Sequence, residues 1–404
     1  MSVVERQDEL DLPAPARAAR PVVNLMLTNF RSYAALTLES GRGSVVLTGA
    51  NGAGKTNILE ALSMLAPGRG LRGATLAQLS RKLANEDEDG PGSPWAVGAT
   101  IEGPTGPVQL GAGYMPGGES AASKRVIRVD GETRGTSAAF TDHVQMIWLT
   151  PAQDRLFLDG ASDRRRFLDR LIAGFDARHA SLWSAYEKAM RDRLSLLRSG
   201  RMDANWLSSI ERIMAETAVA LGASRNEALA HLTAVLSEED PSSAFPAADL
   251  ALDGEIERAL TAMPAIRVED EFAHALSANR SLDAEAGRTK QGPHTTDMLV
   301  RHRTKGRDAR HCSTGEQKSL MIRLVLAGAD LASRRTDATP VLLLDEIVAH
   351  LDDQRRRALF SVVGRLGAQA WYTGVEQRPF EALGANARFF NVSNGSVTPA
   401  SRSF

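Results

Sequence analysis

The stretch that decides the fold reads Gly49-Ala50-Asn51-Gly52-Ala53-Gly54-Lys55-Thr56. It fits the pattern G-x-x-x-x-G-K-[ST], in which a glycine-rich loop cradles phosphate groups. Residues 45–47 are apolar, as a buried strand would be, and residues 57–65 carry apolar side chains at helical spacing. A strand, a loop and a helix in this order are the context that the motif requires. We therefore predict an α/β fold built around a phosphate-binding loop.

The residue types of this loop suit the binding of a nucleoside triphosphate. Glycine permits backbone conformations in which successive N–H groups point at phosphate oxygens. The Lys55 ammonium suits the β- and γ-phosphates, and the Thr56 hydroxyl suits a magnesium ion. We predict that ATP is bound by Gly49, Ala50, Asn51, Gly52, Ala53, Gly54, Lys55, Thr56 and Asn57.

A second motif lies almost a whole chain length downstream. Residues 341–344 are apolar and lead directly to Asp345 and Glu346. Such a run is typical of a strand covered on both faces in a parallel sheet, whose carboxyl end is where α/β folds bind ligands. We predict that Asp345 holds Mg²⁺ together with Thr56, and that Glu346 activates the attacking water. Because neither motif completes a site alone, the fold must bring them together.

A third motif, Ser313-Thr314-Gly315-Glu316-Gln317, precedes a predicted helix over residues 316–332. Ser313 followed three residues later by Glu316 is a capping box, which needs no further role to explain it. The S-x-G-x-Q pattern also resembles the signature of ABC ATPases, which presents a helix N-terminus to the nucleotide of a second subunit. The resemblance implies that Ser313, Gly315 and Gln317 contact ATP in a dimer.

Several motifs together resemble the RecF family of bacterial DNA-repair ATPases, which are akin to the heads of SMC proteins. They are residues 27–33, 49–60, 150–154, 164–169 and 292–294, the signature, the acidic strand, Leu351-Asp352, and residues 369–373. The resemblance implies an ABC/SMC-type ATPase head with ATP and Mg²⁺ as cofactors, and weak ATP hydrolysis that DNA stimulates. It also implies a catalytic role for Gln153, in the segment that resembles the Q-loop.

The same resemblance implies a role in recombinational repair and replication. An ATP-sandwiched homodimer would close on duplex DNA near single-strand gaps, and would help to load RecA together with RecO and RecR. This chain departs from the usual RecF pattern at two places. Glu346 stands where a second Asp is common, and Thr295-Thr296 follows the Gly-Pro-His landmark where Arg and Asp are usual. The position that is His in transporters is Thr373.

The composition is that of an ordinary globular protein, with 404 residues, 43% of them hydrophobic and 24% charged. The net charge of −1 gives no whole-molecule attraction to nucleic acid, so DNA contacts must come from local patches. One cysteine excludes an internal disulfide. Neither a membrane span nor a signal peptide is predicted, so we expect a cytoplasmic protein.

We predict four segments along the chain. Residues 1–21 form a disordered tail, and residues 22–160 form the N-terminal half of the head, with the phosphate loop and an antiparallel β lobe. Residues 161–290 form an inserted helical subdomain, in which helices over 163–199 and 203–238 make a helical hairpin. Residues 291–404 complete the head with the signature, the acidic strand and the D-loop.

Two basic clusters are candidates for DNA contact. Arg164, Arg165 and Arg166 begin a predicted helix, and Arg301 and Arg303 open a series of alternating basic residues. Charge runs are usually solvated faces, and this remains the simpler interpretation of each cluster. The alternative is sequence-independent contact with phosphates. Because aromatic residues make up only 5% of the chain, duplex-backbone binding is favoured over base stacking.

Two other functions fit parts of the pattern. An ABC-type module of transport or translation would share the three motifs. The long insertion, the missing switch histidine and the lack of membrane segments disfavour it. An ATPase-linked nuclease would need a second acidic cluster downstream, but the chain ends soon after Thr373.

Overall fold

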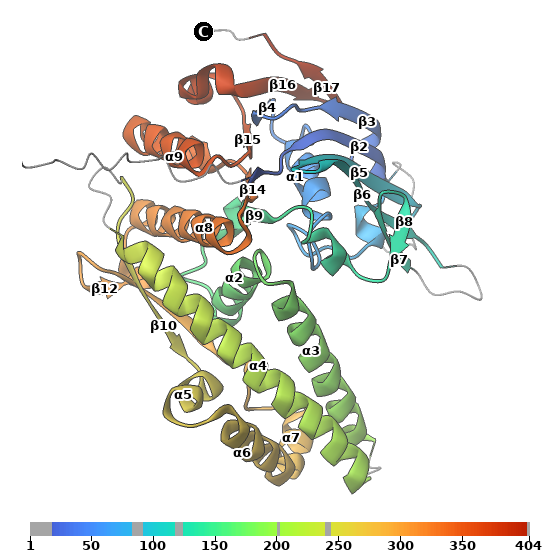
Figure 1. Cartoon of the computed structure of the whole chain (residues 1–404), viewed down its shortest axis with the longest axis vertical. Coiled ribbons are helices and arrows are strands. Elements are labelled where there is room, and N and C mark those ends of the chain that lie inside the picture. Colours follow the sequence, from blue (N-terminus) through green and yellow to red (C-terminus); the bar gives the residue numbers. More distant parts are fainter. Residues whose placement is uncertain (1–17, 83–91, 118–123, 200–202, 239–243, 402–404) are drawn as a thin grey trace, which may run out of the picture.

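The computed structural model describes residues 18–82, 92–117, 124–199, 203–238 and 244–401, which form a head above an elongated helical arm (Figure 1). Most of the predicted disordered tail, residues 1–17, lies outside the described residues. The end of that segment is not disordered. Strand β1 (Ala18–Ala19) pairs in parallel with β13 (Ala338–Thr339), so the predicted tail is too long by these residues.

A six-stranded sheet organises the head. All of its neighbouring strands are parallel except one pair at its edge. Its order is β17-β16-β4-β15-β14-β9, and β17 runs antiparallel to β16. The strands are β4 (Ser44–Thr48), β9 (Met146–Leu149), β14 (Val341–Leu344), β15 (Ala370–Gly374), β16 (Ala387–Ser393) and β17 (Ser396–Pro399). Strand β15 separates β4 from β14, so the phosphate loop and the acidic pair leave the same sheet edge one strand apart.

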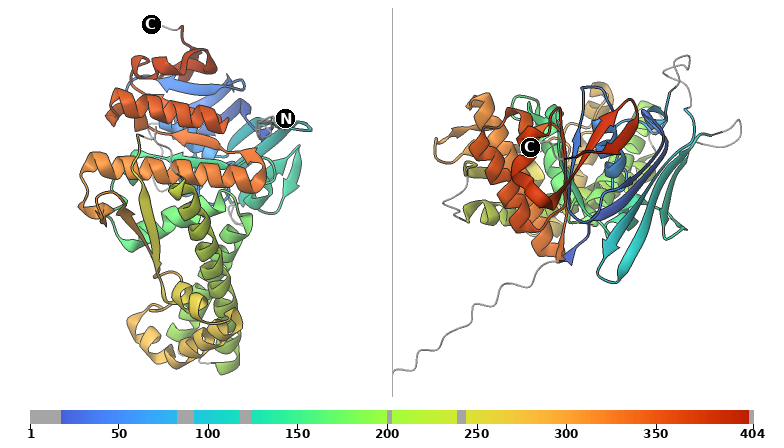
Figure 2. Two further views of the ribbon diagram at one scale, coloured as in Figure 1. Left: turned by 60° about the vertical axis from the view of Figure 1, so that its left-hand side comes forward. Right: turned by 90° about the horizontal axis from the view of Figure 1, so that it is seen from above.

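Both faces of this sheet are buried, as the apolar run before Asp345 predicted. Leu342 and Leu344 pack into a core with helices α8 (Thr314–Thr336) and α9 (Asp353–Leu366). Val341 and Leu343 face the other way, into a core with helix α1 (Lys55–Ser63) and the second sheet. Figure 2 shows the layers from above, with the C-terminal helices on one side and the β lobe on the other.

The second sheet of the head is the predicted antiparallel β lobe. It has six strands in the order β3-β2-β5-β6-β7-β8, and all neighbours are antiparallel. The strands are β2 (Val22–Phe30), β3 (Tyr33–Glu39), β5 (Trp95–Gly103), β6 (Gly106–Met115), β7 (Lys124–Val129) and β8 (Glu132–Arg134). Helix α1 lies between the two sheets and packs on both.

The arm is built from helices α2 (Ala161–Ala173), α3 (Ala177–Arg198), α4 (Ala204–Ser237), α5 (Glu255–Ala262), α6 (Ala265–Ala278) and α7 (Arg280–Ala286). Helices α3 and α4 form the predicted hairpin (Figure 1). The prediction of one helix over 163–199 is wrong. Helix α2 ends at the Gly174 cap, and α3 begins where the Asp176 carboxylate accepts a hydrogen bond from the Arg178 N–H. Within the described ranges, none of the helices combines the length and apolar character that crossing a bilayer requires.

A small antiparallel sheet contradicts the prediction of a wholly helical insertion. Its strands are β10 (Ala248–Asp253), β11 (Asp297–His302) and β12 (Arg307–Asp308), with β11 in the middle. Strand β10 reads Ala-Asp-Leu-Ala-Leu-Asp and belongs to the segment predicted to be helical. Its partner β11 lies beyond the predicted boundary at residue 290. The pairing therefore spans that boundary, and the domain limits remain predictions.

One buried side chain joins the two ends of the chain. The Gln369 amide donates to the carbonyls of Val22, Gly41 and Gly43 at 3.0–3.1 Å. Its carbonyl oxygen accepts from the Val22 N–H at 2.9 Å and from the Trp371 indole at 3.1 Å. Gln369 thus fastens β15 to the start of β2 and to the turn before β4.

We expect Gln369→Leu to lower the free energy of unfolding by roughly 3–5 kcal/mol, because several buried donors and acceptors lose their partner. Urea denaturation followed by circular dichroism measures the change. Gln109→Leu, an exposed substitution of the same kind on β6, is the control and should change it by less than about 0.5 kcal/mol. Equal effects from both variants would show that the Gln369 bonds do not matter.

Candidate functional site

The phosphate loop runs from the end of β4 into α1, and two of its glycines have no room for a side chain. Gly49 has φ 147°, and a Cβ there would lie 2.2 Å from the Val392 carbonyl oxygen. Gly54 has φ 110°, and a Cβ there would lie 2.8 Å from the Ser32 and Tyr33 hydroxyls. Glycine is therefore required at both positions for steric reasons, in addition to its backbone freedom.

The Lys55 side chain is held over this loop. Its Nζ donates to the Gly49 carbonyl at 2.7 Å and to the Ala50 carbonyl at 2.9 Å. Burial lowers the pKa of Lys55, and the nearby carboxylates of Glu346 and Asp345 oppose that shift. The ammonium is therefore placed between the loop and the acidic pair, and phosphate binding by the residues 49–57 stays a prediction.

The structure brings together the two half-motifs that the sequence separates. The Thr56 hydroxyl donates to Asp345 Oδ1 at 3.0 Å, although the two residues lie 289 positions apart. The Thr373 hydroxyl donates to the same oxygen at 2.8 Å and accepts from the Glu346 N–H at 2.8 Å. Thr373 ends the strand between β4 and β14, so one hydroxyl contacts both acidic residues.

The chemistry of these oxygens fits the magnesium ion that the sequence predicts. Thr56 and Asp345 offer a hydroxyl and a carboxylate, the hard oxygen donors that Mg²⁺ prefers. Burial raises the pKa of Asp345, and its hydrogen bonds from Thr373 and Thr56 oppose the shift. The described residues contain no group of three or more His, Cys, Asp or Glu arranged to hold a metal. A site with few protein ligands matches Mg²⁺, which is usually shared with substrate phosphates.

Glu346 has a strained backbone. Its φ of 52° and ψ of 18° lie in the left-handed region, which costs a non-glycine residue about 1–2 kcal/mol. The bond from its N–H to the Thr373 hydroxyl helps to fix this conformation. Strain of this kind is common where a side chain must be aimed at a substrate. The contacts of Thr373 depend on strand order, so its residue type and its neighbours in the sequence do not predict them.

The predicted catalytic role of Gln153 gains no direct support. Gln153 ends the short helix η3 (Pro151–Gln153), and its side-chain oxygen accepts from the Thr150 N–H at 2.8 Å. Its amide thus closes its own turn, and its role in hydrolysis remains a prediction. The next residue, Asp154, forms an ion pair with Lys318 of α8 at 3.3 Å. This ion pair connects the segment after β9 to the signature helix.

The signature begins α8 with the predicted capping box. Ser313 Oγ accepts from the Glu316 N–H at 3.4 Å, and Glu316 Oε2 accepts from the Ser313 N–H at 3.0 Å. A hydrogen bond from Lys305 and the bond from the Ser313 N–H lower the pKa of Glu316 to about 2. Ser313 and Gly315 are exposed and open to a partner.

Gln317 does not share that exposure. Its side chain is 3% exposed, and its amide donates to the Cys312 carbonyl at 2.9 Å. Gln317 therefore supports the loop that carries Ser313. The helix turns the Gln317 side chain inward in this chain, and its contact with a partner's nucleotide stays a prediction.

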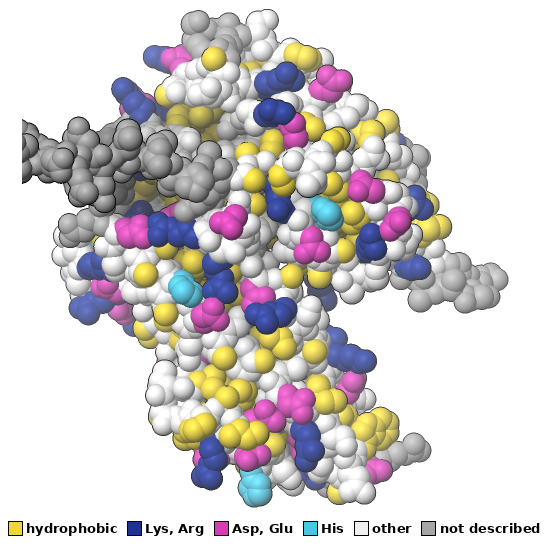
Figure 3. Space-filling view, in the orientation of Figure 1, with side chains coloured by type: hydrophobic (Ala, Val, Ile, Leu, Met, Phe, Trp, Pro, Cys, Tyr) yellow, Lys and Arg dark blue, Asp and Glu magenta, His cyan; other side chains and the backbone are white. Residues whose placement is uncertain are grey.

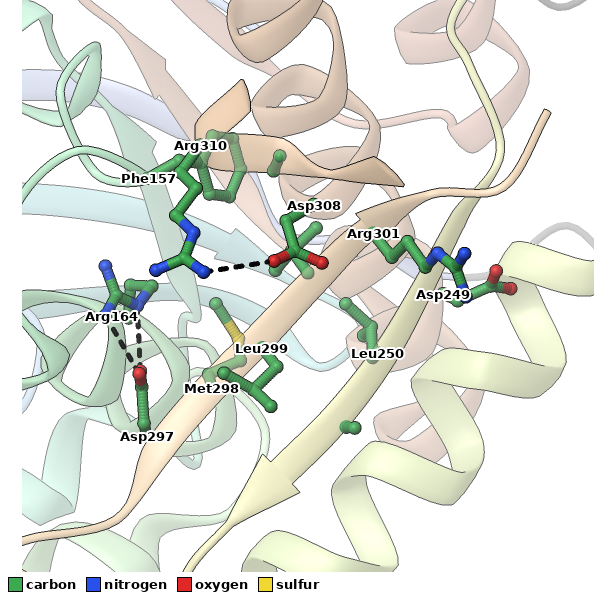
Figure 4. Close-up of a pocket in the computed structure, with 13 residues that line it drawn as sticks. Phe157, Arg164, Asp249, Leu250, Asp297, Met298, Leu299, Arg301, Asp308 and Arg310 are labelled. Carbon is green, nitrogen blue, oxygen red and sulfur yellow. Dashed lines mark hydrogen bonds and ion pairs between the residues drawn. The ribbon is translucent and has the colours of Figure 1, made fainter. Parts of the chain in front are cut away.

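The predicted DNA-binding arginines have partners within the chain, and Figure 4 shows the pairing of Arg164 with Asp297. Arg164 forms a bidentate ion pair with Asp297, with both N–O distances 2.8 Å. Arg165 is 9% exposed and donates to the Thr296 carbonyl. Arg166 is exposed and pairs with Asp163. All three arginines thus have partners within the chain, and their contact with DNA stays a prediction.

The second predicted cluster has partners as well. Arg303 forms an ion pair with Asp249 at 2.7 Å, and Arg301 donates to the Gly306 carbonyl at 2.5 Å. Arg301 lines a cavity of about 390 Å³ beside β11 that carries both charge signs (Figure 4). Figure 3 shows the same mixture across one whole face, where basic and acidic side chains alternate. Neither predicted cluster stands out as a field of one sign.

A polar cluster beside α1 joins Asn57, a predicted ATP-binding residue, to side chains that had no predicted role of their own. Arg31 forms a bidentate ion pair with Glu60, with both distances 2.8 Å, and Arg72 donates to Glu60 and to Asn57 at 3.1 and 3.0 Å. Asn57 in turn donates to the Ser32 hydroxyl at 3.0 Å. These residues border a cavity of about 600 Å³ next to the phosphate-loop helix. Arg31 and Ser32 belong to the segment 27–33, one of the motifs of the family resemblance. Only the fold shows which residues this segment contacts.

Comparison with known proteins agrees with this geometry. Residues 24–80 match the family model of the AAA domain. The DNA replication and repair protein RecF of Mesorhizobium japonicum is 46% identical over 94% of this chain and 97% of its own length. RecF of Rhizobium johnstonii is 45% identical over 92% of this chain and 97% of its own length.

Solved structures show the same fold. The recombination mediator protein RecF of the RecFOR pathway, solved with ATP, superposes with a TM-score of 0.78 at 21% identity, over 96% of this chain and 99% of the other. The Smc head domain of Pyrococcus furiosus gives a TM-score of 0.51 at 16% identity, over 95% and 96%. The predicted ABC/SMC-type ATPase head is thereby confirmed.

We expect Thr373→Val to reduce the turnover number for ATP about 10- to 100-fold, because it removes the hydroxyl that fixes Asp345 and the Glu346 backbone. Steady-state ATPase assays and titration with a fluorescent ATP analogue separate turnover from binding. Thr373→Ser retains the hydroxyl and should restore most of the activity.

Thr339→Val removes a buried hydroxyl from the remote strand β13 and serves as the control. It should leave turnover unchanged. If Thr373→Val and Thr339→Val had the same turnover, Thr373 would have no positioning role.

Proposed function

Because this chain belongs to the RecF family of DNA replication and repair proteins, we propose that it is a DNA-binding ATPase of recombinational repair and replication. In this proposal, two copies close around ATP and hold duplex DNA near single-strand gaps. RecO and RecR would act with it to load RecA, in keeping with the RecFOR pathway of the structurally similar protein. We further propose that it acts in the cytoplasm and that DNA stimulates its weak ATPase activity.

The observation that carries this proposal is the hydrogen bond between Thr56 and Asp345. It joins the end of the phosphate loop to the end of the acidic strand, which makes one half of a composite ATP site. The other half would be the exposed N-terminus of α8, with Ser313 and Gly315. A site divided in this way supports hydrolysis that depends on a second copy.

The geometry supports a simple division of labour in hydrolysis. The loop N–H groups and Lys55 would bind the β- and γ-phosphates, and the positive end of α1 adds to the attraction. Glu346 would orient the water that attacks the γ-phosphorus and accept its proton. Thr56 and Asp345 would hold Mg²⁺, which when bound neutralises charge on the phosphate oxygens. The products are ADP and phosphate, whose release would allow the two copies to separate.

We expect Glu346→Gln to retain ATP binding and slow hydrolysis about 10²- to 10⁴-fold, because the amide keeps the shape of the side chain but not its basicity. A long-lived dimer should then accumulate with ATP. Sedimentation with ATP and with ADP measures the dimer, and phosphate release measures hydrolysis. Wild-type turnover in this variant would move the catalytic base to another residue.

Ser313→Arg tests whether the site is shared between copies. We expect this variant to bind ATP as a monomer but not to dimerise, because the guanidinium would fill the space meant for the partner's nucleotide. Mixed with Lys55→Ala, it should regain part of the ATPase activity. One composite site would then combine an intact phosphate loop with an intact signature.

Ser313→Ala controls for the lost helix cap, which by itself costs about 1 kcal/mol. It should dimerise far better than Ser313→Arg. Full ATPase activity of Ser313→Arg alone, with no dimer detected by sedimentation, would refute the shared site.

A further inference from the structure

A basic groove lies on the helical arm, away from the clusters that the sequence suggested. It is defined by Arg191, Arg198, Arg288 and Lys290. Arg191, Arg288 and Lys290 line a cavity of about 500 Å³ between α3 and the segment that follows α7. Arg198 lies about two α3 turns beyond Arg191. It donates a hydrogen bond to the Gly287 carbonyl in the same segment at 2.9 Å. The groove thus draws its cations from two parts of the chain.

The charge of this groove is available to a ligand. Arg288 and Lys290 are exposed, and within the described ranges neither side chain forms an ion pair or hydrogen bond. Arg198 donates to a neutral carbonyl and keeps its charge. Arg191 Nη1 lies 3.8 Å from Glu187 Oε2. Because both side chains are exposed, solvent screens the attraction between their charges. Arg164, by contrast, is paired with Asp297 at 2.8 Å, so its charge is already neutralised within the chain.

The segment that carries Arg288 and Lys290 is firmly held. The Lys290 N–H donates to the buried Asp283 carboxylate at 3.2 Å, and Asp283 also binds the fully buried Arg193 at 2.7 Å. Arg193 donates in turn to the Thr289 hydroxyl at 3.1 Å. The cations on either side of Thr289 therefore project from a backbone that is already ordered, which lowers the entropic cost of binding a ligand.

The Gly-Pro-His landmark completes this support. His294 contacts the Thr289 carbonyl at 2.9 Å and the Tyr186 hydroxyl at 2.8 Å through its two ring nitrogens. Gly292 has φ 132°, and a Cβ there would lie 2.4 Å from the Tyr186 hydroxyl. The landmark, which the sequence left without a role, thus fixes the segment of the groove against α3.

We propose that the basic groove binds the phosphate backbone of duplex DNA. The inference rests on the proposed function and names a surface for it. Of the four cations, Arg191 alone forms an ion pair with a carboxylate among the described residues, so the groove complements a phosphate chain. Phosphate contacts of this kind are independent of sequence. His294 is the one aromatic side chain among the described residues that line the cavity, and its ring stacks on Tyr186 with the centroids 5.8 Å apart. The groove therefore suits a duplex better than separated bases.

The test compares four forms of the full-length protein: the wild type, Arg288→Gln/Lys290→Gln, Arg191→Gln/Arg198→Gln/Arg288→Gln/Lys290→Gln, and Arg178→Gln/Arg212→Gln/Arg258→Gln/Arg267→Gln. The last is a matched control with the same loss of charge on exposed arginines of the same arm. Binding to a fluorescent duplex is measured with ATP at several salt concentrations, and binding of a fluorescent ATP analogue is measured in parallel. Arg288→Gln/Lys290→Gln is a milder second variant, since these two side chains have no bonding partner in the part of the chain that the structure describes.

We expect the four-residue groove variant to bind duplex at least about tenfold more weakly, and its log–log salt slope to fall by about 2–4, because each lost phosphate contact removes about 0.9 from the slope. The double variant should show a smaller change in the same direction, with ATP binding unchanged. The control should behave like the wild type. Groove variants with wild-type affinity and slope would overturn the inference and leave the proposed function standing. A wild type that binds no duplex with ATP would overturn the proposed function itself.

Discussion

The order of three parallel strands is the constraint on which the rest of this structure depends. Strand β15 lies between β4 and β14, so the phosphate loop and the acidic pair meet at one sheet edge with a single strand between them. That spacing lets Thr56 reach Asp345, and it gives the end of β15 contact with both acids. Each further strand between them would separate the two half-motifs by about another 5 Å.

The sheet order also explains why the ends of the chain must be fastened together. Strand β4 comes early in the sequence, whereas β14, β15 and β16 come late, so the core of the head is built from residues far apart. Gln369 precedes β15, at the end of the sheet away from the phosphate loop. Its bonds to Val22 and to the turn before β4 hold the early and late parts of the chain together. The insertion between the two halves can then form an arm with its own core without disturbing the site.

Buried ion pairs decide which arginines of the arm can meet a ligand. Arg193 and Arg225 are fully buried and bound to carboxylates, and Arg164 is held by Asp297. A buried cation requires such partners, because an unpaired charge in the interior is strongly unfavourable. The same network that neutralises these residues orders the segment carrying Arg288 and Lys290. The buried pair of Arg193 and Asp283 thus holds in place the backbone from which the exposed cations Arg288 and Lys290 project.

The sequence by itself determined what depends on neighbours along the chain. Glycine positions, the apolar strand before Asp345 and the Ser313 capping box are local, and each was predictable and confirmed. The tertiary structure alone decided the role of Thr373, the pairing of β10 with β11, and the partners of the arginines. These depend on contacts between residues distant in sequence, which residue type and spacing do not specify. An arginine run looks the same in a sequence whether its carboxylate partners lie beside it in space or elsewhere.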